Sequence, residues 1–179
     1  MGAAWPEIAK HIRELPMAGV VKIFTVGDAS AQYVSPPPMR IQKKLTENGG
    51  PREYILEEAR KIILGFPDQV KGGKILEHGR SELVGGFNDA SKLLNRRAKD
   101  NVIVFVSDLI ENSKHANCYR DTTCRLPSPT FSLEGAKIVV IGVGAGLPAK
   151  QGMTVATSWL EFLKKAHADV TIDDLRRVN

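Results

Sequence analysis

The most informative chemical feature of this chain is a carboxylate at the end of an apolar run. Residues 102–106 are five apolar residues, mostly β-branched, and the run stops at Ser107-Asp108. An unbroken run of this length is typical of a strand that is buried on both faces of a sheet. Open α/β sheets bind their ligands at the edge where the strands end. Asp108 is therefore a candidate site residue, and the alternative is that its side-chain oxygen only caps the next turn.

Two other groups of residues could carry chemistry, and neither makes a complete site. The glycines of 142–146 follow a strand as in a dinucleotide-binding loop, but Leu147 occupies the position of the last glycine and the helix starts several residues later. His115, Cys118 and Cys124 could contribute to a zinc site, but a structural site needs four ligands and no fourth is evident. We expect a flexible turn at the glycines. The two cysteines argue against a disulfide framework and predict solvated loop thiols.

Strands and helices alternate along the chain, which predicts an α/β fold with a mainly parallel sheet and helices on both faces, a three-layer Rossmann-like arrangement. Apolar spacing and flanking Pro or Gly residues predict strands 20–26, 102–107, 136–143 and 168–172, and helices 5–15, 51–66, 82–95 and 155–166. Pro16 and Pro67 should end the first two helices. The segments 27–50 and 109–131 are expected to be long loops, the first with at most a short helix near 39–45, and loops of this length are often functional.

The chain is basic, with 25 Lys and Arg residues against 20 Asp and Glu residues and a net charge of +5. A basic surface can favour nucleic acid. However, the basic residues fall in small groups without a continuous helical stripe or interleaved aromatic residues, so we expect solvated helix faces. The sequence contains no run of 18 apolar residues, and its first residues lack the pattern of a signal peptide. These features predict a cytoplasmic protein without a membrane span.

Three segments, taken in order, resemble a von Willebrand factor A-type domain. Residues 80–86 are similar to the second metal-binding loop of that family, with Ser81 in place of the usual threonine. Ser107-Asp108 resembles the third loop, and 137–144 resembles the fifth strand. Residues 107–113 are also similar to a divergent bacterial group of such domains that is often carried on mobile elements. The resemblance implies a Rossmann-like fold over nearly the whole chain.

The resemblance also implies a divalent-metal site, whose ligands here would be Asp108, Ser81 and Ser107. Mg²⁺ is a hard cation that takes such oxygen ligands and keeps several waters. The family's first loop, Asp-x-Ser-x-Ser after its first strand, has no counterpart, because the first predicted helix begins near residue 4. Residues 28–32 mimic that loop only in part, since a glutamine replaces one serine. We therefore expect a degraded metal site with at most weak Mg²⁺ binding, and no other cofactor.

These observations together predict a non-enzymatic protein-interaction domain over residues 1–170, followed by a charged tail over 171–179. The family typically binds an acidic residue of a partner protein through its metal, so the resemblance implies a partner that is acidic. The alternative is a nucleic-acid-associated accessory factor, which rests on the basic charge balance alone. We do not expect an enzyme, because no acid–base or nucleophilic pair is visible in the sequence.

Overall fold

The computed structural model describes residues 4–16, 18–23, 26, 38–41, 50–72, 80–98, 100–121 and 123–173. The chain divides into two compact units, the first within residues 1–25 and 31–77 and the second within 26–30 and 78–179. No helix in the described ranges is both long enough and apolar enough to span a bilayer. The candidate site residues all belong to the second unit. The assignment of residues 1–170 to a single domain stays a prediction.

The first unit combines two helices with a short antiparallel ladder. Its elements are α1 (Trp5–Glu14), β1 (Val20–Val21), β2 (Met39–Arg40) and α2 (Pro51–Lys71). The Arg52 guanidinium donates two hydrogen bonds, of 3.1 and 2.9 Å, to the carbonyl oxygen of Leu15 and so joins the start of α2 to the end of α1. The apolar core of the unit consists of Ala9, Ile12, Ile41, Ile55, Leu56 and Ala59.

Several predictions for this unit were wrong. Val20–Val21 does not join a parallel sheet, because β1 pairs antiparallel with β2. Met39–Arg40 is a strand where a short helix was the most that we expected, since the three prolines before it favour extended backbone. Pro67 does not end α2, which continues to Lys71. A proline removes one backbone hydrogen bond at a cost of about 3 kcal/mol, and the packed helix tolerates that loss.

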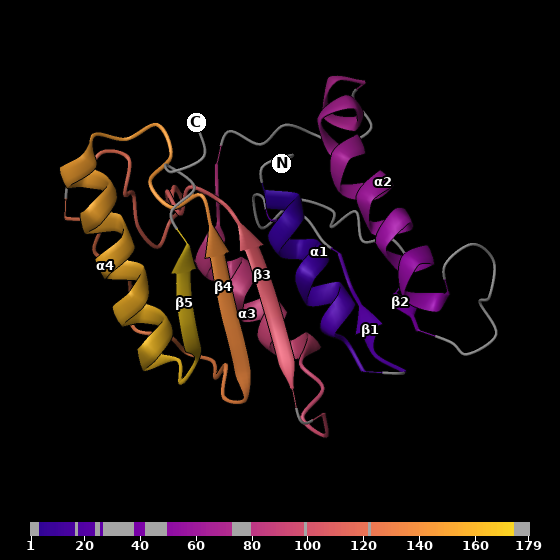
Figure 1. Cartoon of the computed structure of the whole chain (residues 1–179). Helices are drawn as coiled ribbons and strands as arrows, with labels where there is room; N and C mark the ends of the chain where they lie inside the picture. The colour runs from indigo at the N-terminus through magenta and orange to yellow at the C-terminus, as the bar shows by residue number, and fades with distance from the viewer. Residues whose placement is uncertain are drawn as a thin grey trace. The chain divides into compact units, whose positions relative to one another are not determined.

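The second unit contains a parallel sheet with the strand order β3-β4-β5. Its strands are β3 (Asn101–Val106), β4 (Ala136–Ile141) and β5 (Asp169–Asp173), which lie side by side in Figure 1. Alternate residues of the three strands point to one face. They stand in register in the rows Ile103–Ile138–Val170 and Phe105–Val140–Ile172 and join one core. The predicted parallel sheet and its edge strand are confirmed, and β5 extends three residues into the expected tail.

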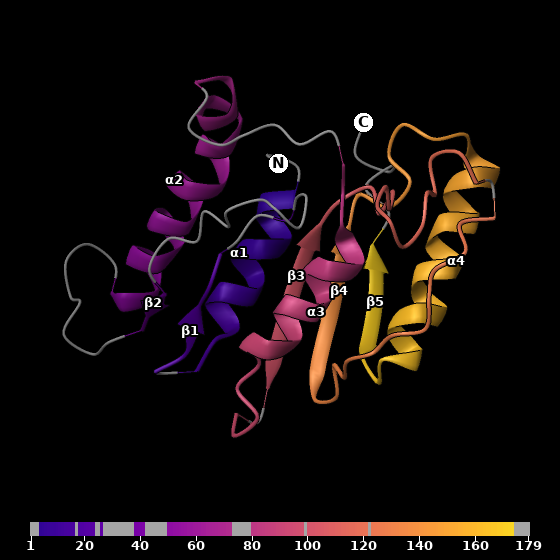
Figure 2. The ribbon, with the colours of Figure 1, turned by 180° about the vertical axis from the view of Figure 1, so that it is seen from behind.

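Helices α3 (Leu83–Leu93) and α4 (Ala149–Lys165) pack on the same face of this sheet. The ring of Phe87 in α3 stacks on Phe105 at 4.4 Å and contacts Trp159 of α4 at 5.4 Å between centroids. Figure 2 shows α3 in front of the sheet and α4 beside β5. The described part of the unit therefore has a helical layer on a sheet, and a third layer stays a prediction.

The described residues of the connection from β3 to β4 form turns and irregular backbone without a helix, and we call residues 107–135 the strap. Parallel strands need a long crossover, which is most often a helix. Here the strap runs along α4 instead (Figure 2), and hydrogen bonds along much of its length hold it there. Their donors and acceptors are Gln151 Nε2 to Cys118 O (3.5 Å), Ser158 Oγ to Thr123 O (3.4 Å) and Leu133 N to Ala166 O (2.7 Å).

Cys118 and Cys124 form a disulfide bond within the strap. The prediction of solvated thiols was wrong, since the two residues are bonded and buried, with exposed fractions of 0% and 1%. A turn in which the Cys124 N–H donates to the Asp121 carbonyl oxygen helps to bring their Cα atoms to 4.3 Å. The bond also removes both sulfur atoms from the zinc site that the sequence left open.

We expect the disulfide to stabilise the second unit. Replacing both cysteines, Cys118→Ala with Cys124→Ala, should lower the free energy of unfolding by about 2 kcal/mol, because the bond closes a short loop in the unfolded chain. Urea titrations followed by circular dichroism would measure the change, and the wild-type chain with and without a dithiol reductant provides the matched comparison. Equal stability of the double variant and of the wild type with and without the reductant would contradict a stabilising role.

A tight glycine turn follows β4 and approaches α4 closely. Gly142, Gly144 and Gly146 all have positive φ, at 95°, 66° and 81°. A Cβ atom on Gly144 would lie 2.7 Å from the Cα of Gly152 in α4, so the turn packs against the helix only without a side chain at this position. The Gly144 N–H also donates to the carbonyl oxygen of Asp108 at 2.8 Å. This turn is thus tied to the candidate site.

Alanine at two of these glycines should separate backbone strain from steric contact. Gly146→Ala places a side chain in open space and should cost about 1 kcal/mol, which is the penalty of positive φ alone. Gly144→Ala adds a backbone clash with Gly152, so its cost should reach about 3 kcal/mol. Urea unfolding of both variants gives the comparison, and equal losses would show that the approach to Gly152 is not constrained.

Candidate functional site

Asp108 lies two residues after the end of β3, at the carboxyl end of the parallel sheet. The Ser107 N–H continues the ladder by donating to the carbonyl oxygen of Ile141 at 3.0 Å, and the chain then turns. Both side chains shape that turn. Ser107 Oγ accepts the Leu109 N–H and Asp108 Oδ1 accepts the Ile110 N–H, each at 3.0 Å. The capping role considered for Asp108 is thus present, and the residue also remains partly exposed.

The turn after Asp108 is anchored to α4 by a buried tryptophan. Leu109 is fully buried and has a φ of 59°, a left-handed conformation that is costly for a branched side chain. Its carbonyl oxygen accepts a hydrogen bond of 2.7 Å from Nε1 of Trp159. The aromatic core therefore holds this strained backbone in place, and Asp108 directly precedes it.

Glu111 is a fully buried carboxylate that caps α3 from a distant part of the chain. Its Oε2 accepts the backbone N–H groups of Leu83 and Val84, at 2.8 and 3.1 Å, and its Oε1 accepts the hydroxyl of Ser113. These amides are the first of α3 and would otherwise lack partners, and a negative charge suits the positive end of the helix dipole. Glu82, the local capping position, makes no side-chain cap.

Sequence reasoning missed this capping role of Glu111. A capping residue normally precedes its helix by one position, whereas Glu111 follows the start of α3 by 28 residues. The absence of Ser, Thr, Asp or Asn at the local cap position was the available signal. It indicates that the first turn of the helix needs acceptors from elsewhere.

Ser81 lies beside the strap, where its backbone pairs with Asn112. The Ser81 N–H donates to the Asn112 carbonyl oxygen at 3.2 Å, and the Asn112 N–H returns a bond of 3.0 Å. The structure therefore connects the segment before α3 to the turn that carries Ser107 and Asp108. Residues 28–32, the alternative first loop, lie outside the described residues.

The donor set for a divalent metal is small. The three implied ligands, Asp108, Ser81 and Ser107, supply one carboxylate and two hydroxyls, and both oxygens of Glu111 are engaged by protein donors. Within the ranges that the structure describes, no three His, Cys, Asp or Glu residues are grouped as metal ligands. This set does not fit a complete Mg²⁺ site, which uses carboxylates with several waters or phosphates. Metal binding by these three residues stays a prediction.

We define the rim as residues 107–113 together with 142–146, the two turns joined by the bond from Gly144 to Asp108. Comparisons with models of protein families, with curated proteins and with solved structures found no match to this chain. The chemistry of the rim therefore has to follow from its own residues. It presents a partly exposed carboxylate on a backbone that is fixed at both ends.

Burial raises the pKa of the Glu111 carboxyl above its ordinary value, while hydrogen bonds from Ser113, Val84 and Leu83 oppose that shift. A raised pKa means that the folded chain binds this proton more tightly than the unfolded chain does. The corresponding stability is fully present below the ordinary value of 4.5 and is lost as the pH rises through the folded-state pKa.

The Glu111→Gln variant should lose this part of the pH dependence. The free energy of unfolding of the wild type, minus that of the variant, should fall as the pH rises from about 4.5 toward 8. Urea titrations at several pH values would measure it, with Glu134→Gln, an exposed carboxyl removed elsewhere, as the control. A difference that stays constant or grows with pH would show that ionisation of Glu111 does not oppose folding.

Proposed function

We propose that this chain is a non-enzymatic protein-interaction domain of the von Willebrand factor A type, from the divergent bacterial group, with a degraded metal site. The partner binds at the rim and contacts Asp108. The observation that carries the proposal is the position of this carboxylate: it is partly exposed, follows the apolar strand β3 and lies at the carboxyl edge, where α/β sheets bind ligands. The three-layer arrangement of that family is part of the same proposal.

The fixed backbone around Asp108 supports recognition as its role. The residue lies between the ladder bond of Ser107 and the buried, tryptophan-anchored Leu109, and its own carbonyl oxygen is held by Gly144. A group that is already ordered loses little conformational entropy when a partner binds. Acid–base catalysis needs a second group placed for proton transfer, whereas recognition needs only an accessible charge in a fixed position.

The alternative, a basic accessory factor for nucleic acid, has weaker support. The positive charge is divided over both units, whereas phosphate binding favours a concentrated patch. The expected cytoplasmic location rests on the sequence alone. The Cys118–Cys124 disulfide does not support it, because disulfides are more typical of proteins in oxidising compartments.

Partner capture with matched variants tests the proposal. The tagged chain would be purified from cells of its source, as wild type, Asp108→Asn and Glu134→Gln, and the bound proteins quantified by mass spectrometry. Asp108→Asn keeps the oxygen that accepts the Ile110 N–H but removes the charge. We expect a protein bound by the wild type and by Glu134→Gln, and reduced about tenfold by Asp108→Asn, in line with loss of a central charged contact.

Two outcomes of the capture experiment would contradict this proposal. The first is an identical set of bound proteins for all three chains. The second is capture that a nuclease abolishes and that weakens steeply with salt, which would support the nucleic-acid alternative. Calorimetry with Mn²⁺ completes the test, since micromolar binding that Asp108→Ala abolishes would show an intact metal site.

A further inference from the structure

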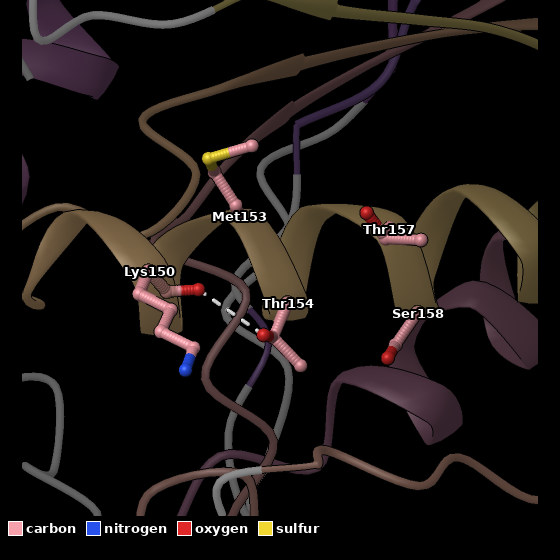
Figure 3. Close-up of a pocket in the computed structure, with 5 residues that line it drawn as sticks. All are labelled: Lys150, Met153, Thr154, Thr157 and Ser158. Carbon is pink, nitrogen blue, oxygen red and sulfur yellow. Dashed lines mark hydrogen bonds between the residues drawn. The ribbon is translucent and has the colours of Figure 1, made fainter.

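The outer surface of α4 carries a groove between two rows of side chains. Residues four apart lie above one another on a helix. Lys150, Thr154 and Ser158 form one row, and Met153 and Thr157 form the other. Figure 3 shows the two rows pointing to opposite sides of the helix ribbon. The space that they border measures about 530 Å³, and we call it the α4 groove.

The shape of the α4 groove matches a helix as the bound element. Rows of side chains four residues apart form ridges, and two helices pack when a ridge of one enters a groove of the other. Small residues such as Thr154, Thr157 and Ser158 allow close approach along the groove. The Thr154 hydroxyl bonds back to the Lys150 carbonyl oxygen at 3.1 Å (Figure 3), so this polar group already has a partner inside its own helix.

The disulfide-closed part of the strap, residues 118–124, lies next to the α4 groove. Ser158 lines the groove and also donates to the carbonyl oxygen of Thr123, and Gln151 reaches the carbonyl oxygen of Cys118 at the other end of the loop. The disulfide and these two bonds hold the loop along the helix. The groove therefore borders a covalently closed loop.

The most exposed large apolar side chains of the described residues belong to these two elements. Met153 of α4 is 67% exposed and Tyr119 of the loop is 68% exposed. Methionine adapts to differently shaped partners, and tyrosine is enriched at interfaces because it is both apolar and able to hydrogen bond. Met153 therefore provides apolar contact area in the groove, and Tyr119 adds an exposed aromatic side chain on the neighbouring loop.

Lys150 is the charged residue that lines the α4 groove, and the loop and the end of α4 carry more basic than acidic residues. Arg120 and Arg125 are exposed in or beside the loop. The acidic residues nearby are Asp121 and Glu161. The Asp121 carboxylate accepts hydrogen bonds from the hydroxyl and the N–H of Thr123 at 2.6 and 2.9 Å, and these bonds lower its pKa. This carboxylate is therefore engaged within the loop. The end of α4 adds Lys164 and Lys165.

We propose that the α4 groove docks an acidic, amphipathic helical segment of a partner protein. This inference rests on the proposed function and names the kind of partner. An apolar row of the segment enters the groove and contacts Met153 and Tyr119. Its acidic flanks face Lys150 and the arginines of the loop, and complementary charge of this kind selects the partner and speeds its association.

Two fluorescent peptides test the proposal on the full chain by anisotropy at about 50 mM salt, where charge contacts are strong. One is a designed helix with a leucine row flanked by glutamates, and the other has lysine in place of each glutamate. We expect the acidic peptide to bind the wild type and the lysine peptide to bind about tenfold more weakly or not at all.

Variants locate the binding. Met153→Glu and Lys150→Glu should each weaken binding of the acidic peptide about tenfold, whereas Arg97→Glu, the same kind of change at an exposed turn before β3, should leave it unchanged. Circular dichroism checks that the variants fold. No binding of the acidic peptide to the wild type, equal binding to all chains, or tighter binding of the lysine peptide would overturn the proposal.

The two proposals fail in different ways. If Asp108→Asn releases the captured cellular partner and Met153→Glu does not, the rim is the binding site and the groove proposal is wrong. If Met153→Glu releases the partner while Asp108→Asn retains it, the groove proposal holds and the role of Asp108 is wrong.

Discussion

Glu111, a buried carboxylate, joins the start of α3 to the strap, two parts of the second unit that are 28 residues apart in sequence. It accepts the first amides of α3, it holds the hydroxyl of Ser113 in the strap, and its own backbone carbonyl oxygen accepts the N–H of Cys118. Removing a partner from a buried charge leaves groups unsatisfied at a cost of about 3 kcal/mol or more. The hydrogen bonds of Glu111 therefore fix the turn that carries Asp108 relative to the start of α3.

The strap explains why a crossover without a helix can be stable. Its backbone carbonyl groups accept hydrogen bonds from side chains of α4, and its disulfide closes a short loop. Its apolar residues are part of the core that α3, α4 and the sheet share. Phe131 contacts Phe162 of α4, which in turn contacts Trp159, so the aromatic packing extends from the strap to the centre of the unit. The inner side of α4 thus organises the core, while its outer side carries the groove.

Patterns within one segment predicted the local structure well. The apolar run at 102–106 is a strand, its end carries Asp108, and the alternating residues after Ala166 form the edge strand. In each of these cases hydrophobicity and a terminating polar residue act over a few neighbouring positions. The prediction at 20–26 was wrong at Val20–Val21 because two residues with strand propensity do not specify their partner, and β1 pairs with β2 instead of joining the parallel sheet.

The sequence by itself determined the α/β class, the parallel pairing of the later strands and the place of Asp108 at a strand end. Those features depend on side-chain periodicity and on the requirement that apolar strands be buried. Only the tertiary structure decided the Cys118–Cys124 bond, the capping of α3 by Glu111 and the strap along α4. These depend on groups far apart in sequence, or on the exact path of a loop, and hydrogen bonds and disulfides form only where the folded backbone brings their atoms within a few ångströms.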